Sequence, residues 1–339
     1  MPDTFTFSTP MELKVVEQDL LPTLVEDDPV FKILPIEEVA TTRLRWRQLD
    51  NFTGLQQVRG LNGKPKNVKM VGMNEFEYKP GYYGEFVTFD EEELTERGEM
   101  GSWDEPADIN DLVGLGQQFL LQRRVDRIRY INFQLLANGS FTVANGRGEV
   151  MHVDSFAIQT LTASVAWGTF ATATPIANIR AAQLLSRGHS VDFGRKAELW
   201  MNRGTFNNFI GNTNANDLFG RRADYGSTFN EVDAVNKLLA ANDLPSIVIY
   251  DKTYNDDNNV TQLFLPNNRA ILVGNRTNGA RIGAYRMTRN AGNPKGEPGA
   301  VTRVIDRREF EVPGSLELHD MHNGGPILEL PSSIVSLTV

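Results

Sequence analysis

The apolar residues of the chain follow a helical spacing in some segments and a strand spacing in others. Between residues 106 and 139 they recur at intervals of three and four, which is the spacing of an amphipathic helix. Asp108 suits an N-cap, and Asn138-Gly139 suits a C-cap in the left-handed conformation. The pattern therefore predicts one long helix from Asp108 to Asn138.

Shorter segments alternate between the two spacings. A helix is predicted over Pro10–Leu21, and others over Pro175–Ser186, Arg195–Asn208 and Thr228–Ala241. Apolar strands are predicted at residues 246–250, 260–265 and 270–273, and a hairpin at residues 141–153 with Asn145-Gly146 at its turn. Helices and strands in such mixed order indicate an α+β fold, not a doubly wound parallel sheet.

Residues 41–100 predict a long ribbon with two limbs. Arg43-Leu44-Arg45-Trp46-Arg47 alternates charged and apolar residues, which indicates a strand with one charged face. The chain turns in a tract rich in Gly, Asn and Lys and returns through Phe76–Phe89. A ribbon of this length cannot bury itself alone. We expect it to lie against neighbouring subunits; the alternative is a β-rich surface subdomain packed on its own chain.

The two ends of the ribbon carry opposite charge. Residues 41–70 have seven cationic side chains and one acid, whereas residues 85–105 have nine acids and one arginine. We expect the basic limb of one copy to lie on an acidic surface of the next. The expected contact residues are Arg43, Arg45, Trp46, Arg47, Arg59, Lys64, Lys66, Lys69, Tyr82 and Tyr83. The expected acidic counterpart is Asp90, Glu91, Glu92 and Glu93.

Composition narrows the classes of function. The chain has 339 residues, a net charge of −9 and no cysteine, so disulfides and thiolate metal sites are excluded. The acidic balance argues against avid nucleic-acid binding. No apolar run approaches the length of a membrane helix, and the first residues do not read as a secretory signal.

The sequence offers no convincing catalytic, cofactor-binding or metal site. His319 and His322 flank Asp320, but a third ligand is not evident. The glycine-rich stretch at 292–299 lacks the ending of a phosphate-binding loop, and Asn255–Asn259 lacks the pattern of a calcium loop. We therefore expect no cofactor and no enzymatic activity.

The order of motifs after residue 262 resembles tailed-phage major capsid proteins of the lambda major head protein type. An N-terminal arm, a charged ribbon, a long helix, a hairpin and a compact α+β unit also follow the order of the Hong Kong 97 phage capsid fold. The motifs that carry the resemblance are Leu263–Asn268, Arg269–Asn275, Gly279–Tyr285, Gly325–Pro331 and Ile334–Val339.

The resemblance implies a domain organisation and a function. Residues 1–40 would form the arm, 41–100 the extended loop, 101–160 the peripheral domain with its long helix, and 161–339 the axial domain, with a return to the peripheral domain around 285–320. The protein would self-assemble into hexamers and pentamers of an icosahedral shell around double-stranded DNA.

The resemblance also implies partners and a location. We expect a separate scaffolding protein, a portal, a decoration protein, and weak contact with packaged DNA that is not sequence-specific. We expect no membrane partner, a place in the virion capsid and assembly in the cytoplasm of the bacterial host. The alternatives are a carbohydrate- or nucleotide-processing enzyme with an inserted loop, and a tail or baseplate structural protein.

Overall fold

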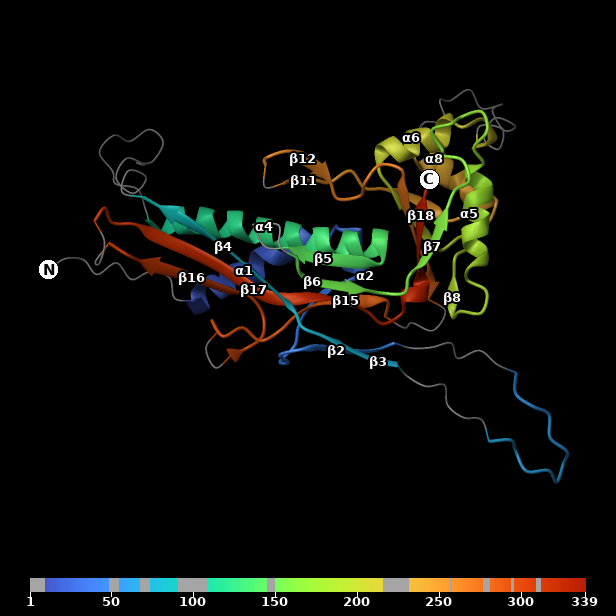
Figure 1. The fold of residues 1–339 in the computed structure, drawn as a ribbon, viewed down its shortest axis with the longest axis horizontal. Helices are drawn as coiled ribbons and strands as arrows, with labels where there is room; N and C mark the ends of the chain where they lie inside the picture. The colour runs from blue at the N-terminus through green and yellow to red at the C-terminus, as the bar shows by residue number, and fades with distance from the viewer. Residues whose placement is uncertain are drawn as a thin grey trace. The chain divides into compact units, whose positions relative to one another are not determined.

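The computed structural model describes residues 10–48, 55–67, 74–90, 109–144, 150–215, 232–256, 258–276, 281–293, 296–308 and 312–339 (Figure 1). The chain divides into two compact units. The first unit takes in Met1–Leu44, Glu77–Ile131 and Ala284–Ile327, and the second takes in Arg45–Phe76, Asn132–Gly283 and Leu328–Val339. Each unit therefore combines segments that lie far apart in the sequence.

The first unit is built around a mixed sheet with helices on one face. Its helices are α1 (Pro10–Val25), α2 (Pro29–Ile33) and the first part of α4 (Ile109–Asn138), and its strands are β1 (Ile36–Glu38), β4 (Gly81–Phe89), β15 (Gly283–Met287), β16 (Val301–Asp306) and β17 (Leu316–Leu328). The long strand β17 is central, since β15, β16 and β4 all pair with it.

Register fixes which side chains share a face of this sheet. Asp320 lies opposite Glu85 of β4 and Thr302 of β16. Because side chains alternate along a strand, these residues share the face that carries Leu316 and Leu318. That face packs on α1 and α4, and its apolar cluster contains the following residues: Leu13, Phe89, Leu112, Val113, Leu120, Leu316 and Leu318.

The N-terminal segment, expected as an arm, packs within the first unit. Asp28 caps α2 by accepting a hydrogen bond from the backbone N–H of Val30. Val30 and Phe31 are buried, and the N–H of Tyr285 donates to the carbonyl of Pro35 at 2.9 Å. The residues that follow α1 are therefore held by their own chain.

The ribbon is shorter than its sequence pattern predicts. Strand β2 (Leu44–Gln48) pairs with β3 (Asn74–Tyr78) in a two-stranded sheet. The return limb was expected to continue to Phe89, but β4 leaves the ribbon and joins the sheet of the first unit. The break falls at Lys79-Pro80, where proline supplies no N–H for strand pairing.

The second unit holds most of the remaining elements. Its helices are the end of α4, α5 (Pro175–Leu184), α6 (Arg203–Gly211), α8 (Val232–Ala241) and the 3-10 turn η2 (Pro331–Ser333). Its strands are β5 (Ser140–Ala144), β6 (Val150–Ser155), β7 (Gln159–Thr162), β8 (Val191–Asp192), β9 (Glu198–Met201), β10 (Ser246–Ile249), β11 (Thr253–Asn255), β12 (Thr261–Leu263), β13 (Arg269–Val273), β14 (Asn275–Arg276) and β18 (Ile334–Thr338).

The main sheet of the second unit has the strand order β10-β9-β13-β18-β7. The pairs at its two edges, β10–β9 and β18–β7, are parallel, and the inner pairs are antiparallel. This mixture confirms the α+β class and excludes a doubly wound parallel sheet.

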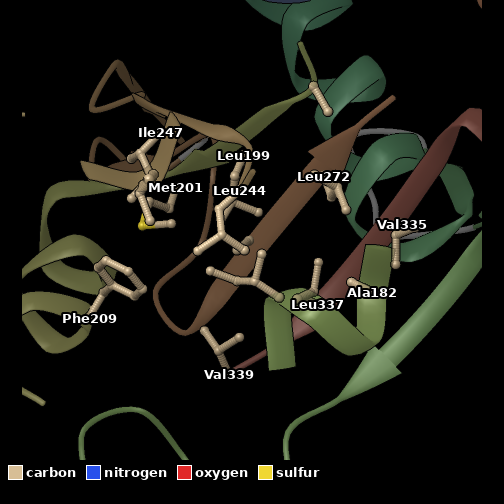
Figure 2. Close-up of a cluster of buried hydrophobic side chains, with 14 of the residues drawn as sticks. Ala182, Leu199, Met201, Phe209, Leu244, Ile247, Leu272, Val335, Leu337 and Val339 are labelled. Carbon is tan, nitrogen blue, oxygen red and sulfur yellow. The ribbon is translucent and has the colours of Figure 1, made fainter. Parts of the chain in front are cut away.

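A large apolar core lies against this sheet (Figure 2). Leu272 and Leu337, from neighbouring strands, point into it, as do Phe209 of α6 and Ala182 of α5, and all four are at most 1% exposed. Fully burying a side chain of this kind contributes about 1.5–3 kcal/mol. The core thus holds the apolar C-terminal strand β18 in place between β13 and β7.

Most predicted elements of the second unit are confirmed, and one is wrong. The helix predicted over Arg195–Asn208 is a strand, β9, followed by a helix, α6. Leu199, Trp200 and Met201 are fully buried in β9. Asn202 then starts α6, since its side chain accepts a hydrogen bond from the N–H of Thr205 at 2.7 Å.

Candidate inter-subunit surface

Two ion pairs join the strands of the ribbon. The guanidinium of Arg43 lies 2.6 Å from the Glu77 carboxylate, and that of Arg47 lies 2.7 Å from Glu75. Arg45, on β2, is exposed. Exposed pairs of this kind contribute about 0–1 kcal/mol each. Arg43 and Arg47 therefore stabilise the hairpin itself while keeping charge at its surface.

Trp46 anchors the ribbon to the second unit. Its ring stacks on Phe76 of β3 and lies against Phe156, with centroid distances of 5.4 Å in both cases. Phe156 in turn stacks on Phe141 of β5 at 6.4 Å. This row of rings gives Trp46 partners within its own chain.

The described part of the ribbon tip, residues 55–67, is exposed throughout and contains no helix or strand. Leu55, Val58 and Leu61 are 99%, 100% and 98% exposed. The tip contains one turn, in which the N–H of Gly63 donates to the carbonyl of Gly60 at 2.9 Å. The tip therefore leaves three aliphatic side chains in contact with water rather than with the rest of the chain.

The tip is also cationic. Residues 55–67 contain Arg59, Lys64 and Lys66 and no acid, and all three side chains are exposed. The guanidinium of Arg59 donates to the carbonyl of Gly63 at 3.1 Å. Lys69 lies outside the described residues. The tip therefore presents apolar and positive groups together.

The two tyrosines of β4 face opposite ways. Tyr82 is 73% exposed, whereas Tyr83 stacks on His322 at 4.9 Å inside the first unit. Burial raises the pKa of Tyr83 well above its usual value, and the positive charge of Arg127 lowers it by a smaller amount. Of the two, Tyr82 is the one whose position suits contact with a neighbour.

The acidic residues that follow β4 are described only in part. Asp90 is exposed at the end of the strand, and Glu91, Glu92 and Glu93 lie outside the described residues. On the strand itself, Glu85 accepts a hydrogen bond from Arg123 at 2.8 Å. That bond holds the pKa of Glu85 below its ordinary value.

The histidines of β17 do not form a shared metal site. His319 stacks on Phe86 and His322 stacks on Tyr83, and these partners alternate to opposite faces of β4. Across the described ranges, no group of three or more His, Cys, Asp or Glu side chains could hold a metal ion. None of the helices within those ranges is long and apolar enough to cross a membrane.

Sequence reasoning singled out the charges of the ribbon and missed the aliphatic residues of its tip. Leu55, Val58 and Leu61 recur at intervals of three, but Gly60, Gly63 and Pro65 disfavour a helix in this segment. Apolar residues in a segment without helix or strand have no face of their own element to bury. That signal was present in the sequence.

Comparison with known proteins identifies the family. A family model described as phage major capsid protein E matches residues 15–299, while no curated protein matches. A prophage protein of E. coli CFT073 described as a capsid protein is similar in structure, with a TM-score of 0.55, 12% identity, and coverage of 95% of this chain and 98% of that one.

A second solved structure has the same fold. A phage-related protein from Bordetella bronchiseptica RB50 gives a TM-score of 0.56 at 11% identity, covering 97% of this chain and 96% of the other. Likeness at this identity shows the fold, which is the Hong Kong 97-like capsid fold. The family match spans most of the sequence, so the chain belongs to the phage major capsid protein E family and is a structural protein of the phage capsid.

Proposed function

We propose that copies of this protein assemble, as hexamers and pentamers, into a closed icosahedral shell around double-stranded DNA, and that the ribbon tip joins neighbouring copies. The observation that carries the proposal is the exposure of Leu55, Val58 and Leu61, each at least 98% exposed. Burying such side chains contributes about 1.5–3 kcal/mol each. A neighbouring copy is a partner present at every position of a shell.

Charge supports the same arrangement. The tip carries Arg59, Lys64 and Lys66, and β4 is followed in the sequence by Asp90, Glu91, Glu92 and Glu93. Opposite charges on two surfaces of one chain favour head-to-tail contact between copies, and rotation closes such contacts into rings. Each contact is weak, but many act together in a closed shell.

The remaining partners are proposed from the family. A separate scaffolding protein, a portal and a decoration protein would act with the shell, which would assemble in the cytoplasm of the bacterial host. Packaged DNA would be contacted weakly and without sequence specificity, consistent with the net charge of −9. The arm, peripheral and axial boundaries expected from the sequence remain part of this proposal, with the paired strands of the ribbon limited to Leu44–Gln48 and Asn74–Tyr78. The absence of enzymatic activity is also part of it.

Negative-stain microscopy tests the assembly. The purified full-length protein, alone or with its scaffolding partner, is expected to form closed shells or capsomer rings. A tail or baseplate protein would form tubes instead. A homogeneous compact monomer under all conditions would contradict the proposal.

A matched pair of triple variants tests the tip. Leu55→Ser, Val58→Ser and Leu61→Ser together should reduce the yield of particles by at least about tenfold while leaving the soluble subunit folded. The control variant carries serine at Val150, Val153 and Val260. These three side chains are 60%, 57% and 51% exposed. Equal particle yields from the two variants would remove the tip from the interface.

A further inference from the structure

Two carboxylates from different elements bind one buried guanidinium in the first unit. Arg124 of α4 lies 2.5 Å from Glu17 of α1 and 2.9 Å from Asp320 of β17. The side chains of Arg124 and Asp320 are 2% and 7% exposed, and that of Glu17 is 14% exposed. Because the site is shielded from water, the interactions among the three charges are strong.

Three further side chains near Asp320 add no positive charge to the site. The hydroxyl of Thr302, on β16, donates a hydrogen bond to it at 3.2 Å, and Glu85 of β4 lies close enough to repel it. On the same strand, His322 is buried against Arg124 and Arg127, and its pKa is lowered to about 3 by burial first and then by these arginines. His322 is therefore neutral and adds no positive charge.

Burial raises the pKa of Asp320 to about 6. The negative charges of Glu17 and Glu85 act in the same direction, whereas Arg124 and the Thr302 hydroxyl oppose the shift. The ionised carboxylate is thus disfavoured in this site although it has an arginine partner. Part of the free-energy cost of ionising Asp320 comes from repulsion by Glu17, and this part is present only while α1 is in place.

Helix α1 is attached to the first unit mainly through partly buried side chains. Leu13 is the one buried residue among its described side chains, and the side-chain amide of Gln117 donates to the Leu13 carbonyl at 2.6 Å. Val15 and Val16 are 55% and 42% exposed. Leu20, Leu21, Leu24 and Val25 are only half-buried, so the ion pair to Arg124 is a substantial part of what holds this helix, and the helix is sensitive to a change in it.

We propose that α1 is a releasable strap on the first unit, and that protonation of Asp320 tightens it by leaving Arg124 to Glu17 alone. Detachment of α1 admits water to Asp320 and removes the repulsion from Glu17, and both effects lower the affinity of Asp320 for a proton. The attached state therefore binds a proton that the detached state does not.

The direction of the pH effect follows from this difference. The attachment of α1 becomes stronger as pH falls through about 6, which is the pKa of Asp320 with α1 in place. The increase in attachment is complete once the pH reaches the lower pKa that Asp320 has when α1 is detached. Between about pH 7.5 and about pH 5, the equilibrium constant for attachment should rise about tenfold.

Hydrogen exchange measured by mass spectrometry tests the strap in the full-length protein, assembled or not. After correction for the intrinsic pH dependence of exchange, amides of α1 should exchange about tenfold more slowly at about pH 5 than at about pH 7.5. Asp320→Asn should give the slow rate at both pH values. Glu17→Gln, which changes a residue at the edge of the site, should reduce the pH dependence, because it removes the repulsion from Glu17 but not the effect of burial.

The matched control is Glu317→Gln. Glu317 lies on β17 but bonds to Arg307 and His319 on the opposite face of the strand, so its loss should leave the exchange of α1 unchanged. An unchanged pH dependence in Glu17→Gln would overturn the proposal, as would faster exchange of α1 in the wild type at the lower pH. Shell formation plays no part in the result.

Discussion

The Nε of Arg129 donates a hydrogen bond to the Asp28 carboxylate at 2.8 Å, and both side chains are buried. This pair joins α4 to the N-cap of α2. Arg129 also lies over the Phe31 ring, 5.6 Å from its centroid. One arginine thus organises the segment that follows α1.

Asp28→Ala should destabilise the first unit by about 3–5 kcal/mol, because it leaves a buried guanidinium short of a partner and removes the cap of α2. Denaturant unfolding of the full-length protein measures the loss. Glu75→Ala is the control, since it breaks the exposed pair with Arg47 and should cost only about 0–1 kcal/mol. Similar losses for the two variants would contradict this assignment.

Two glycines of the α4 region should respond to alanine in opposite ways. Gly139 has a φ of +69°, and a Cβ there would lie 2.8 Å from Ile158 Cγ1 and 3.0 Å from the Phe156 carbonyl oxygen. Gly139→Ala should therefore lower stability by more than about 1 kcal/mol. Gly114 has open space around it, so Gly114→Ala should raise stability by about 0.5–1 kcal/mol. Thermal unfolding of both variants checks the signs.

His322→Phe should alter how stability depends on pH. Burial lowers the pKa of His322 to about 3 from 6.5, so the unfolded state binds a proton that the folded state does not below pH 6.5. The contribution of neutral His322 to the free energy of unfolding is fully present above pH 6.5 and is lost as pH falls towards 3. The stability of wild type relative to His322→Phe should decline by about 1.4 kcal/mol per pH unit in that range.

The comparison between the two proteins isolates His322. Asp320 contributes in the opposite direction, because its raised pKa makes the folded state gain stability as pH falls through 6. That contribution is present in wild type and in His322→Phe alike. Urea unfolding at several pH values gives the difference, and a flat difference would show that His322 does not stay neutral.

Trp46→Ala should loosen the ribbon without unfolding the second unit. The rings of Phe76 and Phe156 lose their shared partner, so amides of β2 and β3 should exchange at least several-fold faster. Arg47→Gln, which removes only an exposed ion pair, should have a smaller effect. Equal effects of the two variants would indicate that the aromatic contacts do not hold the ribbon.

The sequence predicts elements well where one pattern runs through many residues. The long apolar series gives α4, whose end at Asn138 is confirmed by the left-handed Gly139. Prediction from the sequence fails at β9, because Leu199-Trp200-Met201 is apolar on both faces. Whether such a short buried segment forms a helix or a strand depends on the elements that pack beside it. Those neighbours, β10 and β13, come more than forty residues later.

The candidate surface was predictable in charge but not in contacts. Arg43 and Lys64 are exposed, as their polar surroundings indicate. The stacking of Trp46 on Phe156 joins residues from different segments, and no local period reveals it. The same holds for Glu17, Arg124 and Asp320, whose association depends on the pairing of β17 with β4 and β16.

An inner strand of each main sheet comes from the end of the sequence, and this bears on how the protein is made. Strand β17 lies between β16 and β4, and β18 lies between β13 and β7. A ribosome synthesises their neighbours first, β4 and β7 among them, and leaves both sheets open until residues 316–338 emerge. A translation product that stops before residue 316 would lack an inner strand of each sheet, so neither core could close before synthesis of the chain is nearly complete.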